Sequence, residues 1–361
     1  MNNARGRKVA TIADVSKMAG VSTMTVSRVV NGAANVRAGT REVVNAAIAA
    51  LNYTPNQAAR HLAGGQLTRI GVLYSNPSAS YLSELLVGLL NKASLSHVQL
   101  VVQKCDADEQ AREVIEDLLA GGIDGLILPP PFCDSREVIE LVTAKGVPAV
   151  LVASGQPDKR LSAVSIDDRR AAYEMTRHLL RLGHQRLGFI IGHPNQTASA
   201  RRQEGFRQAM ADAGLAVDER FVVQGLFNYR SGLDAAEILL GQDPRPTAVF
   251  ASNDDMAAAT VAIAHRLGLD VPGDLTVVGF DDAPLATAIW PELSTVRQPI
   301  KDMAEAAVDL LVREIRAPSD GPGEQLLMDS TLVRRQSDAA PRLRPSALAR
   351  RSTNHQIGKS A

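Results

Sequence analysis

The stretch TIADVSKMAGVSTMTVSRVVNG, residues 11–32, places two short helical patterns on either side of a glycine. Before the glycine, apolar residues recur at the spacing of one helical face, at Ile12, Val15 and Ala19. Gly20 interrupts this pattern, and Ser22 can cap a second helix running from Thr23 to Asn31. Two helices joined by a tight turn predict a helix-turn-helix unit. A three-helix packing unit that binds no nucleic acid is the alternative.

In a helix-turn-helix unit, the second helix would place its N-terminal residues in the major groove of DNA. Met24 and the methyl group of Thr23 suit contacts with thymine methyls, and Arg28 can hold a guanine edge with both arms of its guanidinium. Other polar residues of this unit suit phosphate contacts, which position a protein without reading sequence. These residues are Ser22, Thr25, Ser27, Arg37 and Arg41.

A third helix is predicted next, with Thr40 as its cap. Its expected buried side comprises Val43, Val44, Ala47, Ile48 and Leu51. Tyr53-Thr54-Pro55 closes the unit, and a short piece, Asn56 to Ala63, ends at Gly64-Gly65. A helix of two turns is unstable alone in water, so this piece needs a partner to fold.

The charge of the chain is unevenly distributed. Lys plus Arg and Asp plus Glu both total 39, but residues 1–69 hold nine bases and two acids, a net charge of +7. The remainder carries 30 bases and 37 acids, a net charge of −7. A basic head on an acidic body predicts a polyanionic partner for the head, with a solvated basic surface as the alternative.

Several classes of protein are disfavoured by the composition. Two cysteines, Cys105 and Cys133, form neither a disulfide framework nor a metal cluster, which favours a reduced compartment. The N-terminus has no apolar segment of a signal peptide, and no apolar run is long enough to cross a bilayer. We therefore expect a cytoplasmic protein with no membrane partner.

From about residue 69, strand-like apolar runs alternate with helical stretches. The predicted strands span residues 70–74, 98–103, 125–128, 149–152, 186–191, 248–251 and 275–280. The predicted helices span residues 81–95, 108–120, 137–145, 169–182, 202–213, 231–240 and 256–267. This alternation predicts two doubly wound lobes with parallel sheets. The tail from about Ser337 is rich in Pro, Ser, Ala and Arg and is expected to be disordered.

Polar residues follow several predicted strands. They are Ser75 and Asn76, Asn253, and Asp281. Arg202 is expected to open its helix, and Phe227 precedes NYRSG. Forked donors, acceptors and an aromatic face together suit a polyhydroxylated ring. The alternatives are that Arg202 is a surface charge and that Asp254, Asp255 and Asp282 only cap helices.

No enzyme signature stands in the sequence. We find no G-x-G-x-x-G loop, no P-loop, no G-x-S-x-G elbow and no His or Cys at metal-ligand spacing. The expectation is a protein that is not an enzyme, with no catalytic residue, metal or cofactor. A stand-alone sugar-binding protein is a second alternative, which the basic head disfavours.

The head resembles the lactose-repressor (LacI/GalR) family of transcriptional regulators. VSxxTVSRVVN at residues 21–31, Thr40-Arg41, and LNYxPNxxAxxL at residues 51–62 carry the resemblance, which continues to about residue 337. It implies an N-terminal all-α helix-turn-helix head plus an α/β two-lobed, periplasmic-binding-protein-like sensor with doubly wound parallel sheets. Small departures are Ser16, Pro129-Pro130-Pro131 and Ala153-Ser154, and the last two leave the effector open.

The implied domains are a DNA-binding domain at residues 1–55, a hinge helix and linker at 56–67, an effector-binding and dimerisation domain at 68–337, and a disordered tail at 338–361. Lobe 1 is expected at about 68–167 and 298–327, and lobe 2 at about 168–297 and 328–337.

The resemblance also implies two sets of site residues. The DNA-binding set is Thr11, Ser22, Thr23, Met24, Thr25, Ser27, Arg28, Asn31, Arg41, Asn56, Ala59 and Leu62. Leu62 would wedge into the minor groove, with a linker hydrophobe as the alternative. The effector-binding set is Ser75, Tyr81, Arg202, Phe227, Asn228, Asn253, Asp281 and Gln298.

The implied function is repression of carbohydrate-utilisation genes, with a sugar as the effector that releases operator DNA. A purine or another metabolite acting as corepressor is the alternative within the same fold. The tail PRLRPSALARRSTNHQIGKSA lacks a leucine heptad, so a homodimer on a near-palindromic double-stranded operator is expected.

Overall fold

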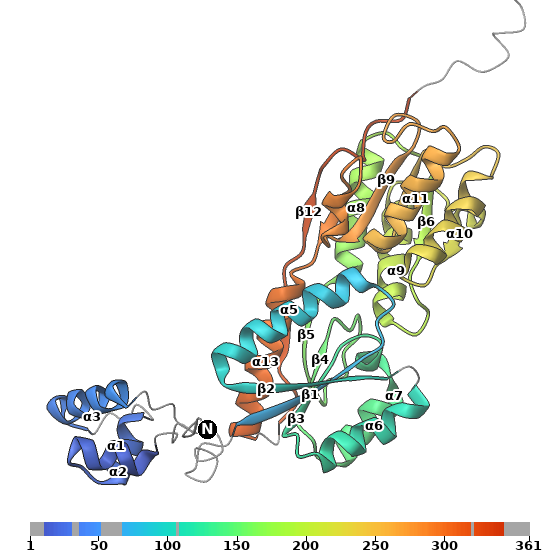
Figure 1. Ribbon diagram of the computed structural model, residues 1–361. Helices are drawn as coiled ribbons and strands as arrows, with labels where there is room; N and C mark the ends of the chain where they lie inside the picture. The colour runs from blue at the N-terminus through green and yellow to red at the C-terminus, as the bar shows by residue number, and fades with distance from the viewer. Residues whose placement is uncertain (1–10, 31–35, 52–66, 106–107, 319–320, 343–361) are drawn as a thin grey trace, which may run out of the picture. The chain divides into compact units, whose positions relative to one another are not determined.

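The computed structural model describes residues 11–30, 36–51, 67–105, 108–318 and 321–342 (Figure 1). The chain divides into two compact units, Met1–Leu67 and Thr68–Ala361. Asn31, Asn56, Ala59 and Leu62 of the expected DNA-binding set lie outside the described residues.

The first unit holds three helices, α1 (Ile12–Ala19), α2 (Thr23–Val30) and α3 (Ala38–Ala50), around a small apolar core. Thr11 caps α1 reciprocally with Asp14, whose carboxylate accepts from the Thr11 N–H over 2.8 Å. Gly20 ends α1 at φ 65°, a left-handed conformation that glycine adopts without steric cost. Gly20 therefore allows the turn between α1 and α2, and the predicted helix-turn-helix is confirmed.

Two predictions for α3 are wrong. The helix begins after Arg37, which makes no side-chain cap bond, so Thr40 lies inside the first turn instead of capping it. Val43 is 51% exposed, whereas Val44 is fully buried. One residue turns a helix by about 100°, so the buried stripe that passes through Val44 and Ala47 leaves Val43 in solvent.

The second unit comprises two α/β lobes. The sheet of lobe 1 is parallel throughout, with the strand order β11-β5-β4-β3-β1-β2. Its strands are β1 (Thr68–Tyr74), β2 (Val98–Lys104), β3 (Gly125–Leu128), β4 (Ala149–Val152), β5 (Ser162–Ile166) and β11 (Gln325–Met328). Helices α5 (Ala79–Ser96) and α13 (Ile300–Arg316) cover one face, and α6 (Asp108–Ala120) and α7 (Arg136–Ala144) cover the other (Figure 1). A 3₁₀ turn, η1 (Phe132–Asp134), precedes α7.

Lobe 2 repeats this plan with the strand order β12-β10-β9-β8-β6-β7, in which only β12 is antiparallel to its neighbour. The strands are β6 (Leu187–Ile191), β7 (Val222–Gln224), β8 (Ala248–Ala251), β9 (Thr276–Asp281), β10 (Ser294–Arg297) and β12 (Thr331–Val333). Helices α8 (Asp168–Arg181) and α9 (Thr197–Asp212) lie on one face, and α10 (Tyr229–Leu240) and α11 (Asp254–Arg266) lie on the other. The short elements are η2 (Glu219–Phe221) and α12 (Leu285–Ala288).

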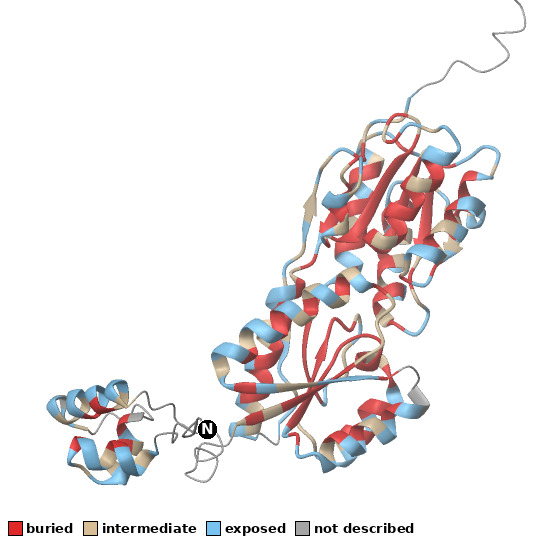
Figure 2. Ribbon diagram, in the orientation of Figure 1, coloured by how far each residue is buried: buried red, intermediate tan, exposed pale blue. Residues whose placement is uncertain are grey.

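The buried residues of each lobe fill the space between its sheet and its helices, as Figure 2 shows. Two helix pairs pack closely enough to require glycine. A Cβ added at Gly88 of α5 would collide with the backbone of α13 at Lys301, and one at Gly205 of α9 would collide with the backbone of α8 at Arg169. Both pairs therefore depend on the missing side chain.

The chain passes between the lobes three times, from β5 to α8, from β10 to α13 and from β11 to β12. In each sheet the strand order reverses beside β1 or β6, because the following strands are added on the other side. Ligands of open α/β sheets bind outside the carboxyl ends of the strands at such switch points. The topology therefore predicts a ligand site at the loops that follow β1, β3, β6 and β8.

The predicted doubly wound fold is confirmed, with three corrections. Helix α9 begins at Thr197, so the expectation that Arg202 opens this helix is wrong. Six elements of the structure, β5, β7, β10, α13, β11 and β12, are not predicted from the sequence. The third correction concerns the expected disordered tail, whose first residues are built into lobe 2. The Asp338 side chain is buried against His178, and Ala339 Nα–H donates to Thr276 Oγ1 over 3.0 Å.

Residues 343–361 lie outside the described part of the chain. None of the helices in the described ranges is long and apolar enough to cross a membrane.

Candidate functional site

The exposed face of α2 carries the residues expected to read DNA. Thr23, Met24 and Arg28 are exposed, with 63% of Met24 accessible. Met24 and Arg28 stand four residues apart and are therefore neighbours on the helix surface. A methionine and an arginine side by side in solvent offer an apolar contact and a forked donor to the same partner.

The remaining described members of this set lie around the start of α2 and on the other two helices. Ser22 is exposed and caps α2, because its Oγ accepts from Thr25 N–H over 3.1 Å. Thr25, Ser27 and Arg41 are half-buried, and Thr11 is exposed at the start of α1. Ser22 and Thr25 thus have structural roles at the start of α2. The exposed parts of their side chains can also contact a phosphate.

A second candidate site lies in the second unit, in the cleft between the lobes. Its cavity of about 30 Å³ has room for one or two water molecules. The lining residues come from both lobes, from the loops that follow strands and from the first turns of helices: Asn76, Ser78, Tyr81, Pro130, Ala153, Gln196, Ala198, Arg202, Phe227, Asn253, Asp281 and Gln298. A larger ligand requires the lobes to separate or the lining side chains to move.

Six of the eight expected effector-binding residues line this cleft, namely Tyr81, Arg202, Phe227, Asn253, Asp281 and Gln298. The structure does not bring Ser75 or Asn228 into the lining. Asn76, one residue after Ser75, takes part instead. Asn228 caps α10, where its Oδ1 accepts from Ser231 N–H over 2.8 Å.

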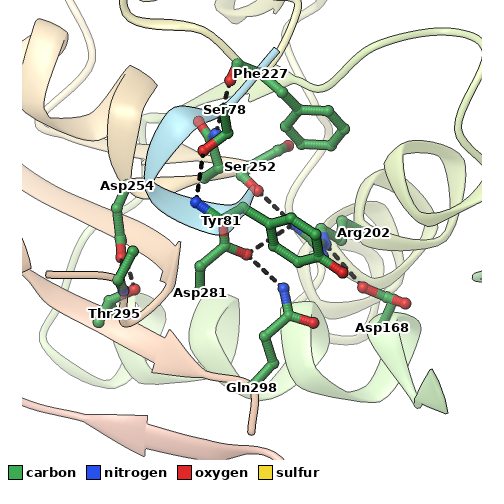
Figure 3. A network of polar contacts seen from close by, with 12 residues as sticks. Ser78, Tyr81, Asp168, Arg202, Phe227, Ser252, Asp254, Asp281, Thr295 and Gln298 are labelled. Atoms are coloured by element: carbon green, nitrogen blue, oxygen red, sulfur yellow. Dashed lines mark hydrogen bonds and ion pairs between the residues drawn. The ribbon is translucent and has the colours of Figure 1, made fainter. Parts of the chain in front are cut away.

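Arg202 is the centre of the cleft (Figure 3). Its Nε donates to Asp168 Oδ1 over 2.8 Å, and its Nη1 donates to the Ser252 carbonyl over 2.6 Å. The guanidinium lies 3.6 Å from the centre of the Phe280 ring and 5.6 Å from that of Phe227. Because only 5% of Arg202 is exposed, the alternative that it is a surface charge is wrong.

Asp281 faces Arg202 from the end of β9. Its Oδ1 lies 3.7 Å from Arg202 Nη1 and accepts from Gln298 Nε2 over 2.6 Å. Its backbone φ of 109° is one that residues other than glycine rarely adopt, and such backbone strain is frequent at functional sites. Burial raises the pKa of Asp281 to about 7, although Arg202 opposes this shift.

The start of α11 forms another wall. Asn253 caps this helix by accepting from Met256 N–H over 3.0 Å, and its Nδ2 donates to the Phe227 carbonyl over 3.0 Å. Asp254, the first residue of α11, accepts from Ala283 N–H over 2.9 Å and from Thr295 Oγ1 over 2.7 Å, so the alternative that it only caps the helix is wrong. The helix end is therefore fixed to the neighbouring strands.

Two other acidic residues weighed as simple capping charges have long-range partners. Asp255 of lobe 2 accepts a hydrogen bond from Ser78 Oγ of lobe 1. Asp282 forms ion pairs of 2.6 Å with both Arg297 and Arg335. The alternative that these two residues only cap helices is therefore wrong.

Sequence reasoning missed a second carboxylate contact between the lobes. Asp134 in η1 of lobe 1 accepts from Thr197 N–H over 2.8 Å and from Thr197 Oγ1 over 2.7 Å, at the start of α9 in lobe 2. Ser154 Oγ donates to the same carboxylate over 2.6 Å. Burial raises the pKa of Asp134, while its hydrogen bonds act in the opposite direction. No local sequence signal marks Asp134, because its partner lies 63 residues away.

Within the described residues, two buried side-chain atoms have no hydrogen-bond partner: Tyr81 Oη and Gln298 Oε1. Both residues line the cleft, and Figure 3 shows them beside Arg202 and Asp281. Leaving a buried polar atom unpaired costs about 1–3 kcal/mol, so a group that bonded to both atoms would stabilise the cleft.

Comparison with known sequences gives a consistent picture. Residues 11–56 match the family of bacterial regulatory proteins, lacI family, and residues 176–337 match the periplasmic binding protein-like domain. The chain is 34% identical to catabolite control protein A of Priestia megaterium, covering 84% of this chain and 92% of that protein. It is 34% identical to the ribose operon repressor of Escherichia coli (strain K12), covering 86% and 94%. It is 30% identical to the transcriptional repressor PurR of Photobacterium profundum, covering 85% and 92%.

Solved structures agree with the sequence matches. The lac repressor dimer bound to operator and the anti-inducer ONPF is similar with a TM-score of 0.76 and 30% identity, over 92% of this chain and all of that one. A complex of the transcriptional regulator CelR with cellobiose is similar with a TM-score of 0.70 and 29% identity, over 91% and 100%.

Proposed function

The chain belongs to the lacI family of bacterial regulatory proteins, and we propose that it represses carbohydrate-utilisation genes until a sugar releases it from its operator. As a transcriptional repressor of this family, it binds DNA through its helix-turn-helix and binds a small-molecule effector. The proposal concerns the identity of the effector, the direction of its effect and the residues that carry both activities.

We assign DNA reading to α2. Arg28 would hold a guanine edge, while Met24 and the Thr23 methyl would contact thymine methyls. Thr11, Ser22, Thr25, Ser27 and Arg41 would contact phosphates, and Asn31, Asn56, Ala59 and Leu62 complete the proposed DNA-binding set. Leu62 would enter the minor groove as an apolar wedge.

One observation carries the assignment of a sugar to the cleft: two buried atoms without partners, Tyr81 Oη and Gln298 Oε1, lie in its wall. A ligand hydroxyl both donates and accepts, so it can bond to the carbonyl oxygen of Gln298 and to the phenol of Tyr81. The Phe227 ring and the carboxylate of Asp281 add an apolar face and an acceptor. Two similar proteins, the ribose operon repressor of Escherichia coli and the regulator CelR in complex with cellobiose, support a sugar as the class of effector.

Control of DNA binding would follow from a change in the separation of the two lobes. The cavity is too small for a sugar ring in this arrangement, so a bound sugar requires the lobes to separate or the lining side chains to move, and the proposed control uses the separation of the lobes. Lobe 1 leads directly into the proposed hinge at residues 56–67, which would order only when two copies stand at the right separation. A change of ~3 kcal/mol in operator binding amounts to more than a hundredfold in affinity.

The proposed assembly is a homodimer, and lobe 1 offers a surface for it. Val87, Leu90 and Leu95 of α5 are exposed, as is Val102 on the edge strand β2 next to this helix. Apolar residues beside an open strand edge favour association with another copy of the chain. A dimer would also match a near-palindromic operator.

The test has two stages with the full chain. A thermal-shift screen against sugars and nucleobases identifies the ligand, since a ligand at 100 times its Kd stabilises a protein by about 2.7 kcal/mol. Binding to duplex DNA is then measured at several salt concentrations, with and without that ligand. We expect affinity that falls steeply with salt and falls again when a sugar is added. A nucleobase that stabilises the chain and strengthens DNA binding would instead favour the purine alternative.

A further inference from the structure

Three helices begin at the cleft, and their first residues line it. Ser78 caps α5, Gln196 precedes α9, and Asn253 caps α11. The N-terminus of a helix carries roughly half a positive charge and exposed N–H groups, which makes it a ready anion site. Together with the guanidinium of Arg202, the cleft thus has four elements that would attract a phosphate or carboxylate.

The protein's own carboxylates already occupy two of these elements. The N-terminus of α9 donates its Thr197 N–H and hydroxyl to Asp134, which reaches across from lobe 1. Arg202 is paired with Asp168 over 2.8 Å and stands 3.7 Å from Asp281. An anionic ligand would have to displace these groups or lie against them.

The other two helix ends are occupied in the same way. The first turn of α11 contains Asp254 and Asp255. Asp255 also accepts the hydroxyl of Ser78, the residue that caps α5, so a single carboxylate lies at both helix starts. Three helix starts and one guanidinium therefore meet five carboxyl groups, Asp134, Asp168, Asp254, Asp255 and Asp281, of which Asp281 is the one among the lining residues.

The described lining contains no second cation that could offset these acids. Arg202 is its sole Lys, Arg or His side chain. The lobe-1 wall includes Pro130 and Ala153, which give a ligand no donor side chain. The polar atoms left unpaired are neutral ones, Tyr81 Oη and Gln298 Oε1.

From this arrangement we infer that the effector is an uncharged polyhydroxyl compound, and that phosphorylated and carboxylated ligands are excluded by the carboxylates already in place. This inference rests on the proposed function, because it assumes that the interlobe cleft is the effector site. At an effective dielectric constant of about 20, two like unit charges about 6 Å apart repel each other. This repulsion lowers the affinity of a charged ligand by roughly a hundredfold. We therefore expect at least about a hundredfold preference for the uncharged member of any matched pair.

The test uses the full chain at pH 8 and matched ligands: D-ribose with D-ribose 5-phosphate, D-glucose with D-glucose 6-phosphate and with D-gluconate, and inorganic phosphate alone. Thermal shift and equilibrium dialysis report binding, and Arg202→Gln shows whether binding occurs in the cleft. We expect each anionic member to bind the wild-type cleft at least about a hundredfold more weakly than its uncharged partner. An anionic member that binds with an affinity equal to or above that of its uncharged partner, or less than about tenfold below it, and loses this binding in Arg202→Gln, overturns the inference.

Two variants test the cause of the exclusion from opposite lobes. Asp134→Asn and Asp255→Asn each remove one charge from a helix start, and each is expected to gain at least about tenfold in affinity for inorganic phosphate or a sugar phosphate. Circular dichroism verifies that each variant is folded. If both folded variants bind these anions no better than the wild type, the carboxylates do not exclude anions and the inference is wrong.

Operator binding separates this inference from the proposed function. An uncharged ligand that fills the cleft without changing DNA binding would contradict the proposed function and leave the inference standing. An anionic ligand that binds in the cleft and changes DNA binding would do the reverse.

Discussion

Arg202 Nε donates to Asp168 Oδ1 over 2.8 Å, and less than a tenth of either side chain is exposed. The pair joins the second turn of α9 to the first residue of α8, beneath the cleft. Burying two charges is costly, and such a pair is not by itself evidence of stabilisation. Its position instead holds one guanidinium rigidly where a ligand would meet it.

The first prediction concerns Arg202→Lys. Lysine keeps the charge but lacks the planar fork that reaches Asp168 and the Ser252 carbonyl together. We expect ligand affinity to fall about 10- to 100-fold in a dialysis or calorimetric titration. The control is Arg201→Lys, since Arg201 is partly exposed and bonds to Glu204. Equal loss in both variants would remove the special role of Arg202.

A second prediction follows from the raised pKa of Asp281, which is about 7 against an ordinary 3.8. The folded chain holds this proton more tightly than the unfolded chain does, so its stability falls as pH rises from about 4 to about 7. We expect Asp281→Asn to be more stable than the wild type at pH 8 by up to about 4 kcal/mol, and by progressively less toward pH 4.

Urea unfolding of the two proteins across this pH range measures the difference. A gap that stays constant with pH would show that Asp281 titrates with an ordinary pKa. The variant should also bind ligand more weakly, because it lacks the charge of Asp281. In the wild type this charge serves ligand binding and lowers the stability of the fold.

Two exposed residues of α2 give a third prediction. Arg28→Ala is expected to cost about 1–3 kcal/mol in operator binding and to relax the preference for one base pair. Met24→Ala should weaken binding wherever a thymine methyl is contacted. The matched control is Met18→Ala, because Met18 of α1 is 54% exposed and Met24 is 63% exposed. Competition with altered duplexes provides the measurement, and an equal effect of Met18→Ala would contradict the assigned reading face.

The buried Asp338 provides a fourth prediction, on stability. Burial raises its pKa, but hydrogen bonds from His178 and Ser294 outweigh this and hold the pKa below its usual value. We expect Asp338→Ala to cost about 2–4 kcal/mol at pH 7, because His178 and Ser294 lose a buried acceptor.

The loss in Asp338→Ala should shrink as pH falls below about 4, since the unfolded wild-type chain then takes up a proton at Asp338 and the folded chain does so only at lower pH. The control is Asp329→Ala, whose side chain is exposed and which should change stability by less than about 0.5 kcal/mol. Chemical denaturation of both variants decides whether the residues after Ser337 are part of the folded lobe.

The elements that could be predicted from sequence are those with strong local signals. Gly20 marks the turn of the helix-turn-helix, and the alternation of apolar runs marks the two lobes. The strand β5 was missed because SAVSI alternates small residues and lacks a long apolar run. Helix α13 had a readable signal in the spacing of Met303, Ala307 and Leu311, which all lie on its buried face.

The cleft could be predicted only in part, because its polar network joins residues distant in sequence. Asn253 and Asp281 follow strands and were found, and Ser78 could have been found as the cap of the helix that follows it. Asp134 and Asp255 could not, since their partners lie 63 and 177 residues away in the other lobe. Whether Arg202 was buried depended on where α9 packs, which no local pattern states.

The most direct test is a titration of a fluorescent duplex, selected from a random pool by the full chain, with and without the sugar found by thermal shift. Saturating sugar should weaken binding of the wild type by about a hundredfold, and Arg202→Lys should need about 10 to 100 times more sugar for the same loss. Identical affinity of the wild-type chain for this duplex with the cleft filled and unfilled would contradict the proposed control of DNA binding.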